Sequence, residues 1–118
     1  MDIPKQLQDK IAQFQNLQNQ LQMVSIQKQQ LMLQKTEIEN ARKELDDVKE
    51  GKVYMMAGPI LLEKDRESCG KKLEDDSGLA STKITVLEKQ EKKLAEKFNE
   101  MRSEIQGMIP GSGGGKGG

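Results

Sequence analysis

Two long stretches of the chain carry apolar residues at intervals of three and four positions, which is the heptad spacing of a coiled coil. The first repeat runs from Leu7 to Leu45, and the second runs from Ile84 to Met108. A helix with one apolar stripe buries that stripe against another helix, so the pattern predicts a mainly α-helical fold in which two long helices pair. Such a pair offers an extended surface rather than an enclosed catalytic cavity.

The two repeats match each other in antiparallel order. The residue numbers of facing positions in an antiparallel pair share a constant sum, which is about 115 for these repeats. The layers that this register predicts are Leu7 with Met108, Phe14 with Met101, Leu17 with Phe98, Leu21 with Leu94, Leu31 with Ile84, Lys35 with Ala80, Ile38 with Ser77, Arg42 with Leu73 and Leu45 with Gly70. The layers near the termini are therefore apolar, and those near the middle of the chain are polar or small.

Between the repeats, residues 52–64 form a continuous apolar run with β-branched and aromatic members around Gly58-Pro59. This composition predicts a short antiparallel β-hairpin that connects the two helices. A lone hairpin is marginally stable in water, so we expect the hairpins of neighbouring subunits to assemble into a β-barrel body; folding back on its own helices is the alternative. The residues expected to mediate this oligomerisation are Val53, Tyr54, Met56, Ile60, Leu61 and Leu62.

The limits of the second helix depend on which argument is followed. Propensity alone starts it near Leu79, because Gly70 and Gly78 each cost about 1 kcal/mol relative to Ala. The register instead favours a start near Arg66, with a kink or fraying between the two glycines. The expected segments are coiled-coil helix 1 at 4–50, the β-hairpin at 52–64, coiled-coil helix 2 at 66–108 and a disordered Gly-rich tail at 110–118.

Composition argues against several functional classes. The chain holds 19 basic and 19 acidic side chains, no His, no Trp and a single Cys. Net neutrality argues against nucleic-acid binding, and the absence of His with only Cys69 argues against a metal site, a disulfide framework and His-based catalysis. We expect no catalytic residues, no metal and no cofactor. No run is apolar enough to span a membrane and no signal-peptide core is visible, so a cytoplasmic location is expected.

Three segments carry a resemblance to a known family. They are Ile11-Ala12-Gln13-Phe14-Gln15-Asn16-Leu17-Gln18, then Val53-Tyr54 followed by Gly58-Pro59-Ile60-Leu61-Leu62, and Leu87-Glu88-Lys89-Gln90-Glu91. With them, the chain from Ile3 to Met108 resembles the beta-type subunits of prefoldin, an ATP-independent cochaperone. The single hairpin matches the beta type, since alpha-type subunits carry two, and the Gln-rich first helix is similar to the archaeal version.

The resemblance implies a hexamer of two alpha-type and four beta-type subunits. It also implies a chaperone that holds unfolded client proteins at the coiled-coil tips and transfers them to a group II chaperonin. The residues that would contact clients at the tip are Ile3, Leu7, Ile11, Phe14, Met101, Ile105, Met108 and Ile109. Alternatively, these side chains merely complete the helix seam, and the chain is a structural coiled-coil adaptor or tether.

Overall fold

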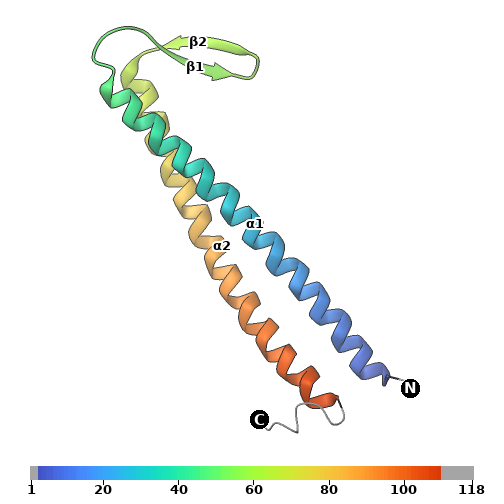
Figure 1. Ribbon diagram of the computed structural model, residues 1–118. Coiled ribbons are helices and arrows are strands. Elements are labelled where there is room, and N and C mark those ends of the chain that lie inside the picture. Colours follow the sequence, from blue (N-terminus) through green and yellow to red (C-terminus); the bar gives the residue numbers. More distant parts are fainter. Residues whose placement is uncertain (1–2, 110–118) are drawn as a thin grey trace. The chain divides into compact units, whose positions relative to one another are not determined.

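The computed structural model describes residues 3–109, which form two long helices connected by a β-hairpin (Figure 1). Helix α1 spans Lys5–Asp47, strands β1 and β2 span Val53–Ala57 and Ile60–Lys64, and helix α2 spans Arg66–Met108. The expected fold class is confirmed as mainly helical with one short antiparallel hairpin. The tail expected at 110–118 lies outside the described residues.

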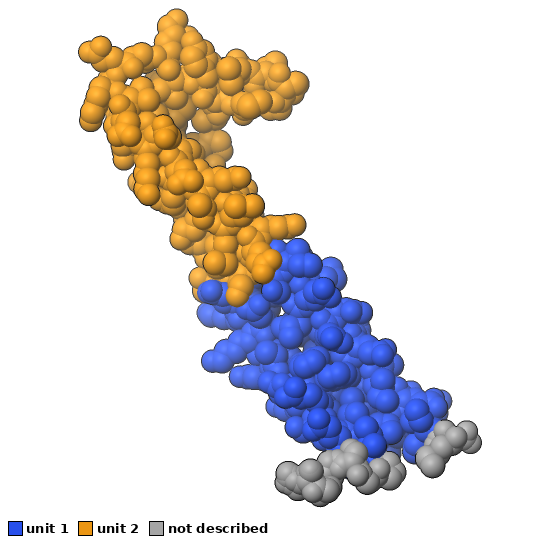
Figure 2. All heavy atoms as spheres, viewed as in Figure 1, with its two compact units in different colours: residues 1–27, 87–118 blue, residues 28–86 orange. Residues whose placement is uncertain are grey.

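The chain divides into two compact units, and each helix contributes to both of them (Figure 2). Unit 1 comprises residues 1–27 and 87–118, so it pairs the first part of α1 with the last part of α2. Unit 2 comprises residues 28–86 and therefore contains the remainder of both helices together with the hairpin.

Large side chains fill the helix pair of unit 1. Leu17 is buried, and the ring of Phe14 stacks on the ring of Phe98 with their centroids 4.4 Å apart. The ammonium of Lys10 lies 2.6 Å from a carboxylate oxygen of Glu104, which links the two helices in the antiparallel register expected. The register pairs Phe98 with Leu17, yet the ring that stacks on Phe98 is that of Phe14, one layer away. The reason is that a seam side chain inserts between successive residues of the facing helix and therefore contacts two layers.

Small side chains fill the helix pair of unit 2. Cys69, Ser77 and Ala80 are its buried residues on α2. On the same helix, a Cβ added to Gly70 would lie 3.6 Å from the side chain of Leu45, so Gly70 faces the residue that the register assigned to it. Short side chains at these positions let the two helices approach closely, since no large group separates them.

Helix α2 is continuous from Arg66 through Gly70 and Gly78, so the fraying expected between the two glycines is wrong. It begins at Arg66, where the register argument had started it, rather than near Leu79. The physical reason is that packing against a partner helix contributes more to helix stability than intrinsic propensity does.

The residue before α2 caps the helix. A carboxylate oxygen of Asp65 accepts a hydrogen bond from the backbone N–H of Ser68 at 2.6 Å, and its other oxygen accepts one from the Ser68 hydroxyl at 3.0 Å. An aspartate at this position satisfies a backbone donor that the first helical turn leaves unpaired and places negative charge at the positive end of the helix dipole.

Helix α1 ends at Asp47, whereas the sequence had suggested residue 50. The backbone N–H of Val48 donates to the carbonyl of Leu45 at 3.1 Å, a tighter bond than the regular helical one, and this closes the last turn. The guanidinium of Arg66 also donates to the Leu45 carbonyl at 3.1 Å and to the following carbonyl at 3.4 Å. The first residue of α2 therefore satisfies carbonyls at the end of α1.

The hairpin pairs its strands in a regular antiparallel ladder, from Val53 opposite Lys64 to Ala57 opposite Ile60. Gly58 begins the two-residue turn with a φ of 62°, a conformation that glycine adopts without steric cost. This register determines which side chains share a face of the hairpin.

Candidate functional site

The hairpin exposes large apolar side chains on both faces. Tyr54, Met56 and Leu61 lie on one face, because directly paired residues point to the same side, and they are 51%, 72% and 61% exposed. On the other face, Ile60 and Leu62 are 55% and 40% exposed. Exposed apolar groups gathered on one short element are typical of an interaction surface.

Strand β1 also packs partly against its own unit. Val53 and Met55 are half-buried, and they border a groove of about 520 Å³ whose walls include the helix residues Leu45 and Val48. The thiol of Cys69 is free and buried at this groove. Of the six residues expected to mediate oligomerisation, Val53 is thus the one that the chain itself already shields in part.

The residues expected at the client-binding tip all belong to unit 1, and they differ in exposure. Ile3 and Ile109, which flank the two helices, are 48% and 40% exposed. Leu7 is buried, with 6% of its surface exposed. The remaining members are half-buried along the helix pair: Ile11, Phe14, Met101, Ile105 and Met108. Among these eight residues only the two flanking isoleucines are exposed, and contact through the buried Leu7 would require the helices to separate.

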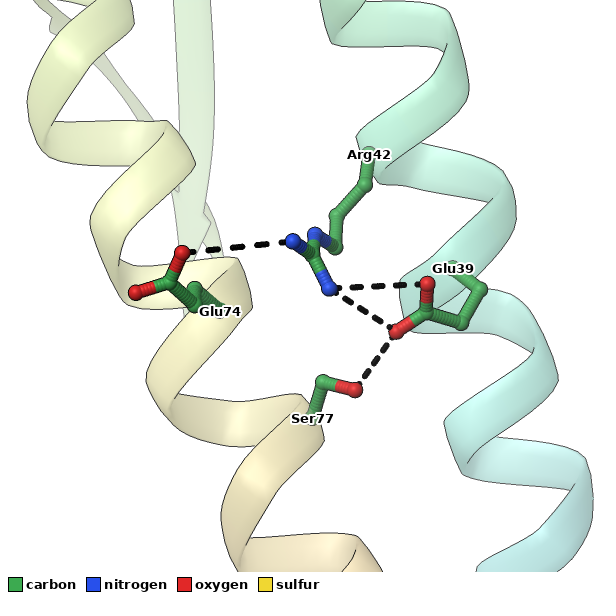
Figure 3. A network of polar contacts seen from close by, with 4 residues as sticks. All are labelled: Glu39, Arg42, Glu74 and Ser77. Carbon is green, nitrogen blue, oxygen red and sulfur yellow. Dashed lines mark hydrogen bonds and ion pairs between the residues drawn. The ribbon is translucent and has the colours of Figure 1, made fainter.

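A polar network crosses the helix pair of unit 2 (Figure 3). The hydroxyl of the buried Ser77 donates to the Glu39 carboxylate at 2.5 Å, and Arg42 on α1 contacts the same carboxylate at 3.2 Å. Arg42 also reaches Glu74 of α2 at 4.0 Å. The Ser77 hydrogen bond, with the positive charge of Arg42, lowers the pKa of Glu39 below its ordinary value of 4.5, although burial opposes the shift.

These contacts link α1 and α2 within unit 2. The hydrogen bond from the Ser68 backbone N–H similarly lowers the pKa of Asp65 below 3.8, which stabilises the charged form of a helix cap. Within residues 3–109, no three His, Cys, Asp or Glu side chains come together as metal ligands would. No helix in that range is long and apolar enough to cross a membrane.

Two contacts in unit 2 were not predicted from the sequence. The layer pattern pairs Ser77 with Ile38, but the hydroxyl of Ser77 donates its hydrogen bond to the carboxylate of the adjacent Glu39. Arg66 was expected only to begin a helix, and it also caps α1. Neither contact has a local sequence signal, because each depends on how the two helices are rotated about their axes.

Comparison with known proteins identifies the family. The prefoldin subunit family model matches residues 8–112. A prefoldin subunit beta from Methanococcus aeolicus is 42% identical over 112 residues, which cover 95% of this chain and 97% of the relative. Another from Archaeoglobus fulgidus is 34% identical over 109 residues, covering 92% and 94%. The chain belongs to the prefoldin beta subunit family. Members of the prefoldin family are chaperones that assemble with other prefoldin subunits, so this chain has a chaperone role as a subunit of a hetero-oligomer.

Solved prefoldin structures share the fold. The crystal structure of the prefoldin beta subunit from Thermococcus strain KS-1 matches with a TM-score of 0.82 and 31% identity, covering 92% of this chain and 96% of that one. The prefoldin beta2 subunit from the same strain matches with a TM-score of 0.70 at 24% identity, covering 76% and 97%, which is a likeness of fold. The hairpin and helix pair described above are therefore those of a prefoldin beta subunit.

Proposed function

We propose that this prefoldin subunit is part of an ATP-independent holdase in the cytoplasm, which binds unfolded proteins and transfers them to a group II chaperonin. The observation that carries the assembly step is the exposure of β2, in which every residue from Ile60 to Lys64 is open to solvent. The unpaired outer edge of such a strand and its apolar side chains can both be satisfied by another hairpin. The proposed assembly contains two alpha-type and four beta-type subunits.

Client contact is proposed at the end of unit 1. Ile3 and Ile109 present apolar surface there without being needed to fill the helix pair, and Met108 beside them is half-buried. The unbranched side chain of methionine adapts to many apolar sequences without a shaped pocket. Each contact is weak, but contacts from several subunits of one assembly combine through effective concentration, so the client is held without nucleotide-driven closure.

The holding function is tested by light scattering of a denatured client protein mixed with the assembled subunits in the absence of ATP. We expect the wild-type assembly to suppress aggregation and the double variant I3S/I109S to suppress it several-fold less. The control is M32S/L33S, which removes two side chains that are 49% and 63% exposed elsewhere on α1. Equal suppression by both double variants would contradict client contact at the isoleucines, and no suppression by an intact wild-type assembly would favour the adaptor function.

The assembly surface is tested separately by native mass spectrometry. Met56 and Leu61 are paired across the ladder and are both exposed, so M56E/L61E places two charges on one hairpin face without unfolding a core. We expect this variant to lose the hexamer. The control V86E introduces a charge at a side chain that is 49% exposed on α2 and should assemble normally. A hexamer that survives M56E/L61E would show that this face is not the interface.

A further inference from the structure

A groove runs along one side of the helix pair in unit 1. It consists of two adjoining hollows of about 400 Å³ and 450 Å³, both bordered by Gln20, Leu94 and Lys97. The α1 wall of this side groove is made mostly of carboxamides. They are Gln13, Asn16, Gln20 and Gln27, whose spacing of three, four and seven residues places them on one helix face.

The floor of the side groove is apolar. Val24 and Leu94 are seam residues that are half-buried between the helices, whereas Met23 lies outside the heptad pattern and is 61% exposed. Helix pairing therefore does not account for a large apolar side chain at Met23. Beside a groove, an exposed methionine can adapt to ligands of different shape.

The α2 wall of the side groove carries lysines along one hollow and glutamates along the other. The hollow that contains Met23 is bordered by Lys93 and Lys97, and no carboxylate lines it. The neighbouring hollow is bordered by Glu100 and Glu104, and Glu104 is already paired with Lys10. In a chain with equal numbers of acidic and basic side chains, this leaves one locally cationic stretch beside an apolar floor.

We propose that the side groove binds an extended segment of an unfolded polypeptide that is both apolar and acidic. The inference rests on the proposed holding function and adds the class of client sequence preferred. Carboxamides donate and accept hydrogen bonds, as the backbone of an extended peptide requires. From Gln13 to Gln27 the α1 wall is roughly 21 Å long at about 1.5 Å per residue, which accommodates about six extended residues at about 3.3 Å each.

A peptide suits this groove better than a nucleic acid does. Single-stranded nucleic acids are held by stacking on exposed aromatic rings within a basic channel. The two aromatic residues of unit 1, Phe14 and Phe98, stack on each other. An oligonucleotide would therefore find no free ring to stack on in this unit.

Fluorescence anisotropy with labelled peptides of about eight residues tests the preference, using the full-length chain alone and assembled with an alpha-type subunit. The probes alternate Glu with Leu, Lys with Leu, or Glu with Ser. We expect the Glu/Leu peptide to bind about tenfold more tightly than either of the others. Its advantage over the Lys/Leu peptide should disappear at high salt, because exposed charges are screened, whereas its advantage over the Glu/Ser peptide should remain. Equal binding of the Lys/Leu peptide, or equally tight binding of an oligothymidylate of similar length, would overturn the proposal.

Charge reversal locates the site. K93E/K97E should weaken binding of the Glu/Leu peptide by about tenfold, which is the scale expected for reversing two exposed charge contacts. K89E/K92E is the matched control, because it makes the same change in net charge at exposed lysines that border neither hollow, and it should change binding by less than about twofold. Equal loss in both variants would refute the groove as the site. Aggregation suppression by the I3S/I109S and wild-type proteins is measured independently, so failure of the groove and failure of the holding function are distinguishable.

Discussion

Replacing Gly70 by alanine should stabilise the helix pair of unit 2. Gly70 lies inside α2, and its φ is not positive, so an L-residue fits its backbone. Alanine is favoured over glycine in a helix by about 1 kcal/mol. The added methyl group would lie 3.6 Å from Leu45, which is an ordinary van der Waals contact, and partial burial there contributes a few tenths of a kcal/mol. The expected gain in the free energy of unfolding is about 1.3 kcal/mol.

Gly78 provides the comparison, because a Cβ at that position meets nothing within 4 Å. Gly78→Ala should therefore gain only the propensity term of about 1 kcal/mol. The two sites lie about 12 Å apart along α2, so the double variant should show nearly additive gains. Gly58→Ala should instead destabilise the protein, because Gly58 has a φ of 62°.

The measurement is urea denaturation followed by circular dichroism, with all variants at one subunit concentration because assembly contributes to apparent stability. A loss of stability in Gly70→Ala would mean that the added methyl group clashes with Leu45, and that the space between the helices is smaller than the 3.6 Å distance indicates. No gain in Gly78→Ala would mean that helix propensity does not limit the stability of α2, and would refute the additive reasoning.

Three further predictions concern polar contacts in unit 2. Arg66→Ala should lower the free energy of unfolding by about 1 kcal/mol in urea denaturation, because the carbonyl of Leu45 loses one of two donors and that of Asp46 loses its side-chain donor. Arg66→Lys should recover part of the loss. Asp65→Ala should reduce the thermal midpoint at neutral pH. Because folding lowers the pKa of Asp65, the wild-type protein is more stable than the variant at pH values above 3.8, the ordinary pKa of an aspartate. This difference in thermal midpoint should disappear as the pH falls through the pKa of the folded state. A difference that stays constant down to pH 2 would contradict the prediction. Ser77→Ala should raise the pKa of Glu39 toward 4.5 in a carboxyl-detected NMR titration, and an unchanged pKa would assign the shift to Arg42 alone.

The heptad pattern predicted the features of the fold that depend on which residues face each other. Leu45 opposite Gly70 follows from the register, and so does a second helix that starts at Arg66. The same pattern could not predict that α2 stays regularly helical between Gly70 and Gly78, because local propensity opposes it and only packing against the partner helix supplies the compensation.

Features that lie beside the seam escaped the sequence analysis. A heptad repeat identifies the residues between two helices, but Gln20, Met23 and Lys93 sit one position away from it and appear as ordinary surface residues. Their common groove depends on which flanks of α1 and α2 are adjacent. The exposed apolar hairpin was predictable because its residues are consecutive in the chain, whereas its partial packing through Val53 depends on how the strands leave the helices.

Because of the contacts made by Asp65 and Arg66, the sequence of the hairpin can change without affecting how the two helices end. One caps the start of α2 and the other closes the end of α1, so both helix ends are completed by contacts that involve no strand residue. Substitutions, insertions or a wholly different turn between Val53 and Lys64 would leave those contacts in place. Partner choice at the hairpin can therefore diverge between related subunits while the helix pair that they carry stays the same.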